Sequence, residues 1–85
     1  MKAQTLVARN LRRLRVRKEI SQEALAVDAG IDRTYVSRLE RELENPSVAV
    51  LERLAKALGA DIRDFFDPAG GRAMEPLKGG RRKRD

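Results

Sequence analysis

The chain has 85 residues and a formal net charge of +6 at pH 7, with 19 Lys and Arg against 13 Asp and Glu, and no cysteine or histidine. This length suits one small domain, and the missing residue types exclude disulfides, thiol chemistry and the commonest metal ligand and general base. We therefore expect no cofactor, and because neither a secretory signal nor an apolar run of about 20 residues is found, we expect a cytoplasmic protein without a membrane span.

The first predicted element is a helix over residues 2–18. Val7, Leu11 and Leu14 recur at helical spacing and form one apolar stripe. Arginine residues fill most of the remaining positions. The sequence thus predicts an amphipathic helix with a basic outer side.

Two shorter helices follow, joined by a very short connection. Ser21 is a favourable N-cap for the second helix, which Gly30 ends. Asp32 is the predicted N-cap of the third helix, over about residues 33–41. Because only Gly30-Ile31-Asp32 separates the two, they have the connection length of a helix-turn-helix. The second helix of such a pair is free to enter the major groove of DNA.

The third helix has two chemically different sides. At about 100° per residue, Tyr35, Val36 and Leu39 fall on an apolar side. The polar side carries Arg33, Thr34, Ser37, Arg38 and Arg41. Arginine can bond guanine with two hydrogen bonds, and threonine can offer a hydroxyl or a methyl group to a base. This side is suited to DNA bases, although a surface helix of any function also has a polar side.

A loop over residues 42–46 leads to a fourth helix and a short fifth helix. Ser47 caps the fourth helix and Gly59 ends it, while Asp61 caps the fifth. The fifth helix contains Ile62, Phe65 and Phe66. Two large apolar residues in a row cannot share one face, so we expect one phenylalanine ring in the core and the other at an interface.

The composition changes at Pro68, where a glycine-rich and basic segment begins. We predict a folded domain over residues 1–67 and a disordered tail over residues 68–85. Residues 1–20 carry seven Lys or Arg and one Glu, residues 42–67 carry three basic and six acidic residues, and the tail carries six basic and two acidic residues. A basic balance favours polyanions as partners, above all nucleic acid.

Several short motifs occur in a characteristic order. They are Ser21-Gln22-Glu23-Ala24-Leu25-Ala26, Ala29-Gly30-Ile31, Tyr35-Val36-Ser37-Arg38-Leu39-Glu40-Arg41, Asn45-Pro46-Ser47 and Leu54-Ala55-Lys56-Ala57-Leu58-Gly59. Over about residues 6–66 the sequence resembles the XRE family, the Cro and phage-repressor type of helix-turn-helix protein. The segment Asp32-Arg33-Thr34-Tyr35 also resembles the controller proteins of restriction-modification systems. The resemblance implies an all-α, lambda-repressor-like domain of five helices, in which the second and third helices form the helix-turn-helix.

The resemblance also implies roles for individual residues. Carried over by position, the base-reading residues are Arg33, Thr34, Ser37 and Arg38. The phosphate-contacting residues are Gln22, Arg41, Asn45 and Ser47. Arg15 and Glu40 match a pair that joins the first helix to the third, and we expect them to form a partly buried ion pair that positions the third helix.

The sequence departs from the family pattern just after the third helix. The family usually has Gly or Asn where this chain has Glu42, and it often has a basic residue where this chain has Glu44. Two acids near the expected DNA backbone should weaken phosphate binding by this loop.

The function implied is that of a transcriptional regulator that binds double-stranded DNA. One recognition helix reads only a few base pairs, so we expect a homodimer on a palindromic operator with half-sites about 34 Å apart. The expected dimer contacts are Ile62, Phe65 and Phe66. An activator would also contact RNA polymerase. The alternative is an antitoxin-type module, whose DNA-binding domain is coupled to a toxin or another protein partner.

We do not expect an enzyme. Asp61, Asp64 and Asp67 have i, i+3 spacing, but they cap and follow a short helix and do not form a metal-ligand cluster. RNA binding also has little support, because the chain offers few aromatic side chains on which bases could stack.

Overall fold

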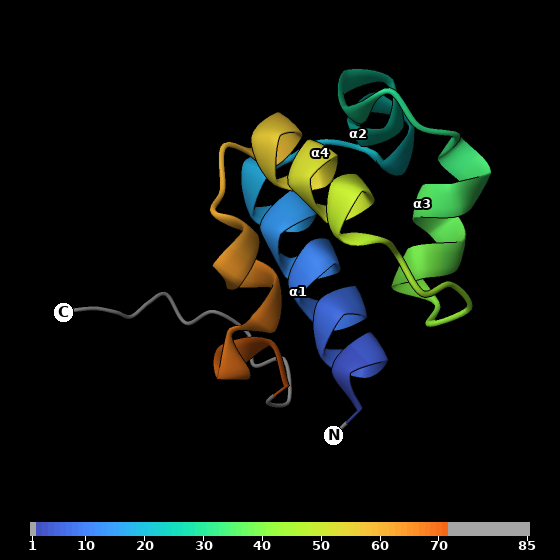
Figure 1. Ribbon diagram of the computed structural model, residues 1–85. Coiled ribbons are helices and arrows are strands. Elements are labelled where there is room, and N and C mark those ends of the chain that lie inside the picture. The colour runs from blue at the N-terminus through green and yellow to red at the C-terminus, as the bar shows by residue number, and fades with distance from the viewer. Residues whose placement is uncertain (1, 72–85) are drawn as a thin grey trace, which may run out of the picture.

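The computed structural model describes residues 2–71, which contain helices and turns and no strand (Figure 1). The elements are α1 (Ala3–Lys18), α2 (Gln22–Ala29), α3 (Arg33–Glu40), α4 (Val48–Leu58) and the 3₁₀ helices η1 (Ile62–Phe66) and η2 (Pro68–Gly71). The all-α class and the helix-turn-helix order agree with the expectation from sequence. The expected count of five helices is not confirmed, because four segments are α-helices and the fifth is a 3₁₀ helix.

Serine and glycine residues set most helix ends. The Ser21 and Ser47 hydroxyls accept hydrogen bonds of 2.9 and 3.1 Å from backbone N–H groups in the first turns of α2 and α4. Gly30 and Gly59 end these helices with φ values of 71° and 65°, which glycine adopts without strain. Asp32 holds the predicted N-cap position of α3, but its side chain makes no capping hydrogen bond.

One hydrophobic core joins the helices. Its largest members are Leu11, Leu25, Leu39, Leu54 and Phe65, each at most 2% exposed. α1 packs against α3, α4, η1 and η2, whereas α2 packs against α3 and α4. α3 is therefore held by α1 and α2, and it lies at the edge of the domain (Figure 1).

The predicted fifth helix is the short 3₁₀ helix η1, with a capping box at its N-terminal end. The Asp61 carboxylate accepts a hydrogen bond from the Arg63 backbone N–H (2.8 Å), and the Asp64 carboxylate accepts one from the Asp61 N–H (3.0 Å). Backbone bonds then run from Asp64 N–H to the Asp61 carbonyl and from Asp67 N–H to the Asp64 carbonyl. These i to i+3 bonds complete a 3₁₀ segment of five residues.

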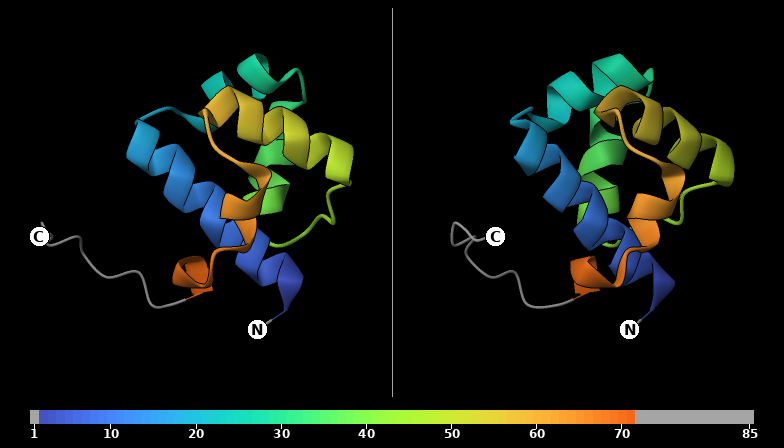
Figure 2. Two further views of the ribbon diagram at one scale, coloured as in Figure 1. Left: turned by 60° about the vertical axis from the view of Figure 1, so that its left-hand side comes forward. Right: turned by 90° about the vertical axis from the view of Figure 1, so that its left-hand side faces the viewer.

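The folded domain extends beyond the predicted boundary at Pro68. Residues 68–71 form η2, which packs against α1 beside η1 (Figure 2). Gly70 is buried there, and a Cβ atom at this position would overlap the Asn10 side chain. Residues 68–71 thus belong to the domain, and the remainder of the predicted tail lies outside the described residues.

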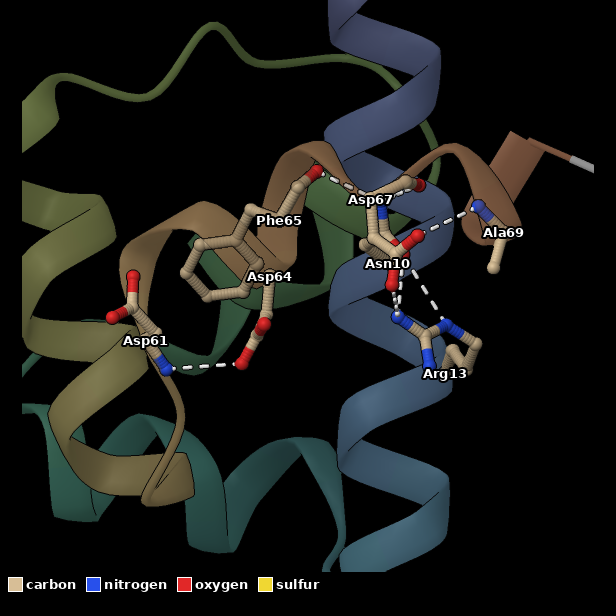
Figure 3. A network of polar contacts seen from close by, with 7 residues as sticks. All are labelled: Asn10, Arg13, Asp61, Asp64, Phe65, Asp67 and Ala69. Carbon is tan, nitrogen blue, oxygen red and sulfur yellow. Dashed lines mark hydrogen bonds and ion pairs between the residues drawn. The ribbon is translucent and has the colours of Figure 1, made fainter.

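Asn10 ties this segment to α1 and is fully buried. Its Nδ2 donates hydrogen bonds to the carbonyls of Phe65 (2.9 Å) and Asp67 (3.0 Å). Its Oδ1 accepts from Nε and Nη2 of Arg13, at 3.2 and 2.8 Å (Figure 3). Both ends of the amide are therefore satisfied, as buried polar groups require.

Glu42 begins the loop after α3 with a left-handed backbone (φ 64°) at the position where the resemblance leads one to expect Gly or Asn. This conformation costs a residue with a Cβ about 1–2 kcal/mol. Glu42→Gly and Glu42→Ala both lose the hydrogen bond that the Thr5 hydroxyl donates to the carboxylate (2.7 Å). Only glycine removes the strain of the left-handed backbone at this position. We therefore predict that, in urea titrations, the free energy of unfolding of Glu42→Gly is about 1 kcal/mol higher than that of Glu42→Ala. Equal stabilities would contradict the left-handed conformation.

Candidate nucleic-acid interface

α3 presents a polar side to solvent, as the helical periodicity predicts. Val36 and Leu39 are buried, and Tyr35 is partly buried against the core. On the opposite side Arg33 and Thr34 are exposed. The other polar residues on this side are Ser37 and Arg38, which are half-buried, and Arg41, which is exposed at the C-cap.

Arg15 and Glu40 form a two-bonded ion pair that holds α3 to α1. Nε and Nη2 of Arg15 donate to the two carboxylate oxygens at 2.6 and 3.0 Å, and Nη1 donates to the Ile20 carbonyl at 2.9 Å. The side chains of Arg15 and Glu40 are 15% and 5% exposed, so water screens the pair poorly. This is the contact that the resemblance implies.

Gln22 joins the same network from the first turn of α2. Its Nε2 donates to the Glu40 carboxylate at 3.0 Å. One carboxylate thus connects α1, α2 and the C-terminal end of α3, and it fixes the orientation of the helix-turn-helix. In the protein without DNA, the Gln22 amide is used inside the chain.

Arg38 is also used inside the chain. Its Nε donates to the Glu44 carboxylate at 2.7 Å, and its Nη2 donates to the Leu43 carbonyl at 3.2 Å. From the sequence, Arg38 is expected to contact bases and Glu44 to repel phosphate. The bond between the two side chains was not expected.

Tyr35 lies within the electrostatic influence of this pair. Burial raises the pKa of the Tyr35 hydroxyl above its usual value, and the negative charge of Glu44 raises it further. Both effects favour the protonated hydroxyl, the form that donates a hydrogen bond.

The loop after α3 is fastened to the start of α1. The Gln4 side chain donates hydrogen bonds of 3.0 Å to the carbonyls of both Glu42 and Glu44. Asn45 and Ser47, the other expected phosphate contacts, are exposed in or after this loop. Gln4 was missed by sequence reasoning, because only its place opposite the loop gives it a role.

The structure brings most of the expected DNA contacts onto neighbouring segments. The Gln22–Glu40 contact places the start of α2 beside the end of α3, and the Arg38–Glu44 contact places the loop beside α3. In addition, Nη1 of Arg53 in α4 donates to the Gly30 carbonyl in the turn of the helix-turn-helix (3.3 Å).

The expected dimer contacts need one correction. Phe65 is 0% exposed in the single chain, because its ring fills the core, so it cannot touch a second copy. Phe66 is 45% exposed and Ile62 is partly buried against the core. Phe66 also borders a shallow hollow of about 160 Å³ that is lined by residues of α1, α4 and the loop before α4.

The three aspartates of the last segment have structural partners. Asp61 and Asp64 form the capping box of η1, and Asp67 accepts a hydrogen bond from the Ala69 backbone N–H. The Arg63 side chain donates to Asp61, and this contact lowers the pKa of the exposed Asp61 carboxyl.

Among residues 2–71, no three Asp or Glu side chains are grouped so as to hold a metal ion. Within the same residues, no helix is long and apolar enough to span a membrane.

The sequence matches known proteins over most of its length. The model of the helix-turn-helix family HTH_3 matches residues 11–65. A Neisseria meningitidis protein described as a hypothetical transcription factor is 46% identical over 63 residues, which are 74% of this chain but only 59% of that protein. Control protein C.BamHI of Bacillus amyloliquefaciens is 38% identical over 63 residues, which are 73% of this chain and 78% of that protein.

Solved structures share the fold. The restriction-modification controller protein C.AhdI from Aeromonas hydrophila superposes with a TM-score of 0.72 at 40% identity, covering 74% of this chain and 96% of that one. The Neisseria factor NHTF superposes with a TM-score of 0.74 at 40% identity, covering 76% and 75% of the two chains. The family match, the identities and the shared fold together show that this chain belongs to the XRE family of helix-turn-helix transcriptional regulators, a family that includes restriction-modification controller proteins.

Proposed function

We propose that this protein is a sequence-specific regulator that reads the major groove of DNA with α3, as a homodimer on a palindromic operator. The observation that carries the proposal is the orientation of α3. Its apolar residues Val36 and Leu39 are buried, and the Arg15–Glu40 pair fixes its C-terminal end, so its polar side faces outward. A helix held in this way presents its polar side to the major groove.

The proposed base readers are Arg33, Thr34, Ser37 and Arg38, and the proposed phosphate contacts are Gln22, Arg41, Asn45 and Ser47. Arg33 is the strongest candidate for direct readout, because it is exposed and stands at the first position of α3. Recognition helices contact base edges mainly with residues near their N-terminal end. Contacts from the start of α2 and from the loop would fix the register on the duplex.

Phe66 and Ile62 are the proposed centre of the dimer contact. The exposed part of the Phe66 ring and the apolar hollow beside it give a second copy a surface on which to pack. Ile62 and Phe66 themselves lie in the acidic part of the chain, residues 42–67. A two-fold dimer would place its two recognition helices about one turn of DNA apart.

The experiment is a selection from random duplex DNA, followed by binding of the enriched duplex at several salt concentrations. The proposal predicts a palindrome with half-sites about one turn apart. If no sequence is enriched and all binding disappears at moderate salt, the protein binds DNA only through its charge. A recovered duplex without symmetry would contradict the homodimer but not the DNA reader.

We predict that Arg33→Ala weakens binding by about 5- to 150-fold for each half-site of the recovered operator, the value of one good arginine–guanine contact. A dimer on a palindrome loses one such contact in each half-site. The substitution should also relax the preference at one base pair of each half-site. Fluorescence anisotropy with operator duplexes substituted one base pair at a time measures both effects. Arg17→Ala is the matched control, because Arg17 is an exposed arginine on α1 outside the helix-turn-helix. If both variants weaken every duplex alike, Arg33 contributes only charge.

A further inference from the structure

Arg38 and Glu44 form an ion pair on the side of α3 that the proposed function assigns to DNA. The Nε of Arg38 lies 2.7 Å from a carboxylate oxygen of Glu44, and the two side chains are 42% and 34% exposed. The Leu43 carbonyl accepts a further bond from Nη2. The guanidinium is thus held at the surface by two acceptors of the loop.

Glu44 is itself held in place. Its backbone carbonyl accepts a hydrogen bond from Gln4 Nε2, and the same amide binds the Glu42 carbonyl, each at 3.0 Å. The Thr5 hydroxyl donates to the Glu42 carboxylate at 2.7 Å. The loop is therefore anchored on α1, and the backbone that carries the Glu44 side chain is held in place beside Arg38.

The pair changes what Arg38 can offer to DNA. A guanidinium has five N–H donors, of which the loop engages one on Nε and one on Nη2. Three N–H groups remain without a partner among the described residues, and two are enough for bidentate contact with guanine. At the same time the negative charge of Glu44 offsets the positive charge of Arg38. Because phosphates attract the protein through its net charge whatever the DNA sequence, this pair weakens the sequence-independent part of binding.

We propose that Glu44 is a positioning residue that raises the sequence specificity of Arg38. It aims the free edge of the guanidinium at base edges, and it reduces the attraction of this part of α3 for phosphate. The inference rests on the proposed function. It adds Glu44, a residue that acts on Arg38 and does not itself contact DNA.

The test compares Glu44→Gln and Glu44→Ala, because glutamine removes the charge and keeps an acceptor, whereas alanine removes both. The surface pair contributes little to folding, so both variants should fold. The probes are the recovered operator and a scrambled duplex of equal length. For both variants, the salt slope of binding to the scrambled duplex should steepen by about 0.9 for each bound protomer, the value of one added phosphate contact.

The ratio of operator to scrambled affinity should fall in a defined order. We predict a loss of about fivefold or more in Glu44→Ala, the lower end of the value of one bidentate base contact, and a smaller loss in Glu44→Gln. Glu42→Gln is the matched control, because it removes one charge from the same loop without touching Arg38. It should change both affinities by the same factor and leave the ratio unaltered.

Equal ratios of operator to scrambled affinity in the three variants and the wild type would overturn the proposal. Glu44 would then affect binding only through its charge. The NMR signal of the Arg38 Nε–H group, recorded without DNA, gives a second readout. It should shift and exchange faster with water in Glu44→Ala but not in Glu42→Gln, and an unaltered signal would overturn the positioning role. A wild-type protein that enriches no operator, with the NMR shift present, would instead contradict the proposed function.

Discussion

Replacement of Glu40 by alanine is expected to lower the free energy of unfolding by about 3–5 kcal/mol, the range for a buried ion pair that loses one partner. The Glu40 side chain is 5% exposed and accepts hydrogen bonds from Arg15 and Gln22. Its removal leaves the Arg15 guanidinium, itself 15% exposed, with the Ile20 carbonyl as its remaining partner. Small domains are stable by only about 5–15 kcal/mol, so a loss of this size is a large share of the total.

Urea denaturation at pH 7 measures the loss, with Glu52→Ala as the control. Glu52 is an exposed glutamate of α4, and its replacement should change stability by no more than about 0.5 kcal/mol. The double variant Arg15→Ala, Glu40→Ala completes a double-mutant cycle. Its loss should be smaller than the sum of the single losses, because no buried charge is left unpaired. Additive losses would contradict a direct interaction between the two side chains.

The local features of the fold were predictable from sequence because each depends on a few adjacent residues. Ser21 and Ser47 bond backbone groups within one turn, and Gly30 supplies a left-handed backbone that few other residues adopt. The two sides of α3 follow from the helical repeat alone, which correctly separates Val36 and Leu39 from the arginines. The side of a helix on which a residue lies depends only on its spacing from nearby residues, so it can be predicted from one sequence.

The contacts of individual polar side chains were less predictable, because they depend on segments far apart in the chain. Arg38 meets Glu44 only because the loop turns back at Glu42 and is fastened by Gln4 at the start of α1. From the sequence, Glu44 has the appearance of a misplaced charge near DNA. In the structure it is the partner of a proposed base reader.

The end of the domain shows the same limit. The composition changes at Pro68, and the glycine-rich segment that follows is typical of disorder. However, Gly70 fits against Asn10 on α1, where any larger residue would overlap the amide. The signal available in the sequence was Asn10 itself. It lies three residues after Val7 and directly before Leu11, within the apolar stripe, where an amide needs buried partners.

The ordering of η1 and η2 against α1 should therefore depend on Asn10. The Asn10 amide crosses from α1 to two carbonyls, those of Phe65 and Asp67, and it also accepts from Arg13 (Figure 3). Phe65, which supplies one of these carbonyls, also buries its ring in the core. Loss of the amide would thus weaken the attachment of the segment that carries Phe66, the proposed dimer contact.

We predict that Asn10→Ala lowers the free energy of unfolding by about 2–4 kcal/mol. It leaves the buried Phe65 carbonyl without its donor, removes one of the two donors of the Asp67 carbonyl, and opens a small cavity. Asn10→Asp keeps the volume but turns a carboxylate oxygen toward the same carbonyls, so its loss at pH 7 should be at least as large. Asn45→Ala, at an exposed asparagine, should change stability by less than about 0.5 kcal/mol.

Hydrogen exchange locates the effect. The Gly70 N–H, in η2, donates to the carbonyl of Asp67, the residue before η2, at 3.0 Å. Its protection should fall in Asn10→Ala by more than the protection of the α4 amides falls, because the segment that Asn10 holds opens first. Uniform loss of protection would mean that Asn10 stabilises only the domain as a whole. Unaltered protection at Gly70 would mean that the packing of Phe65 and η2 against α1 is sufficient without the amide.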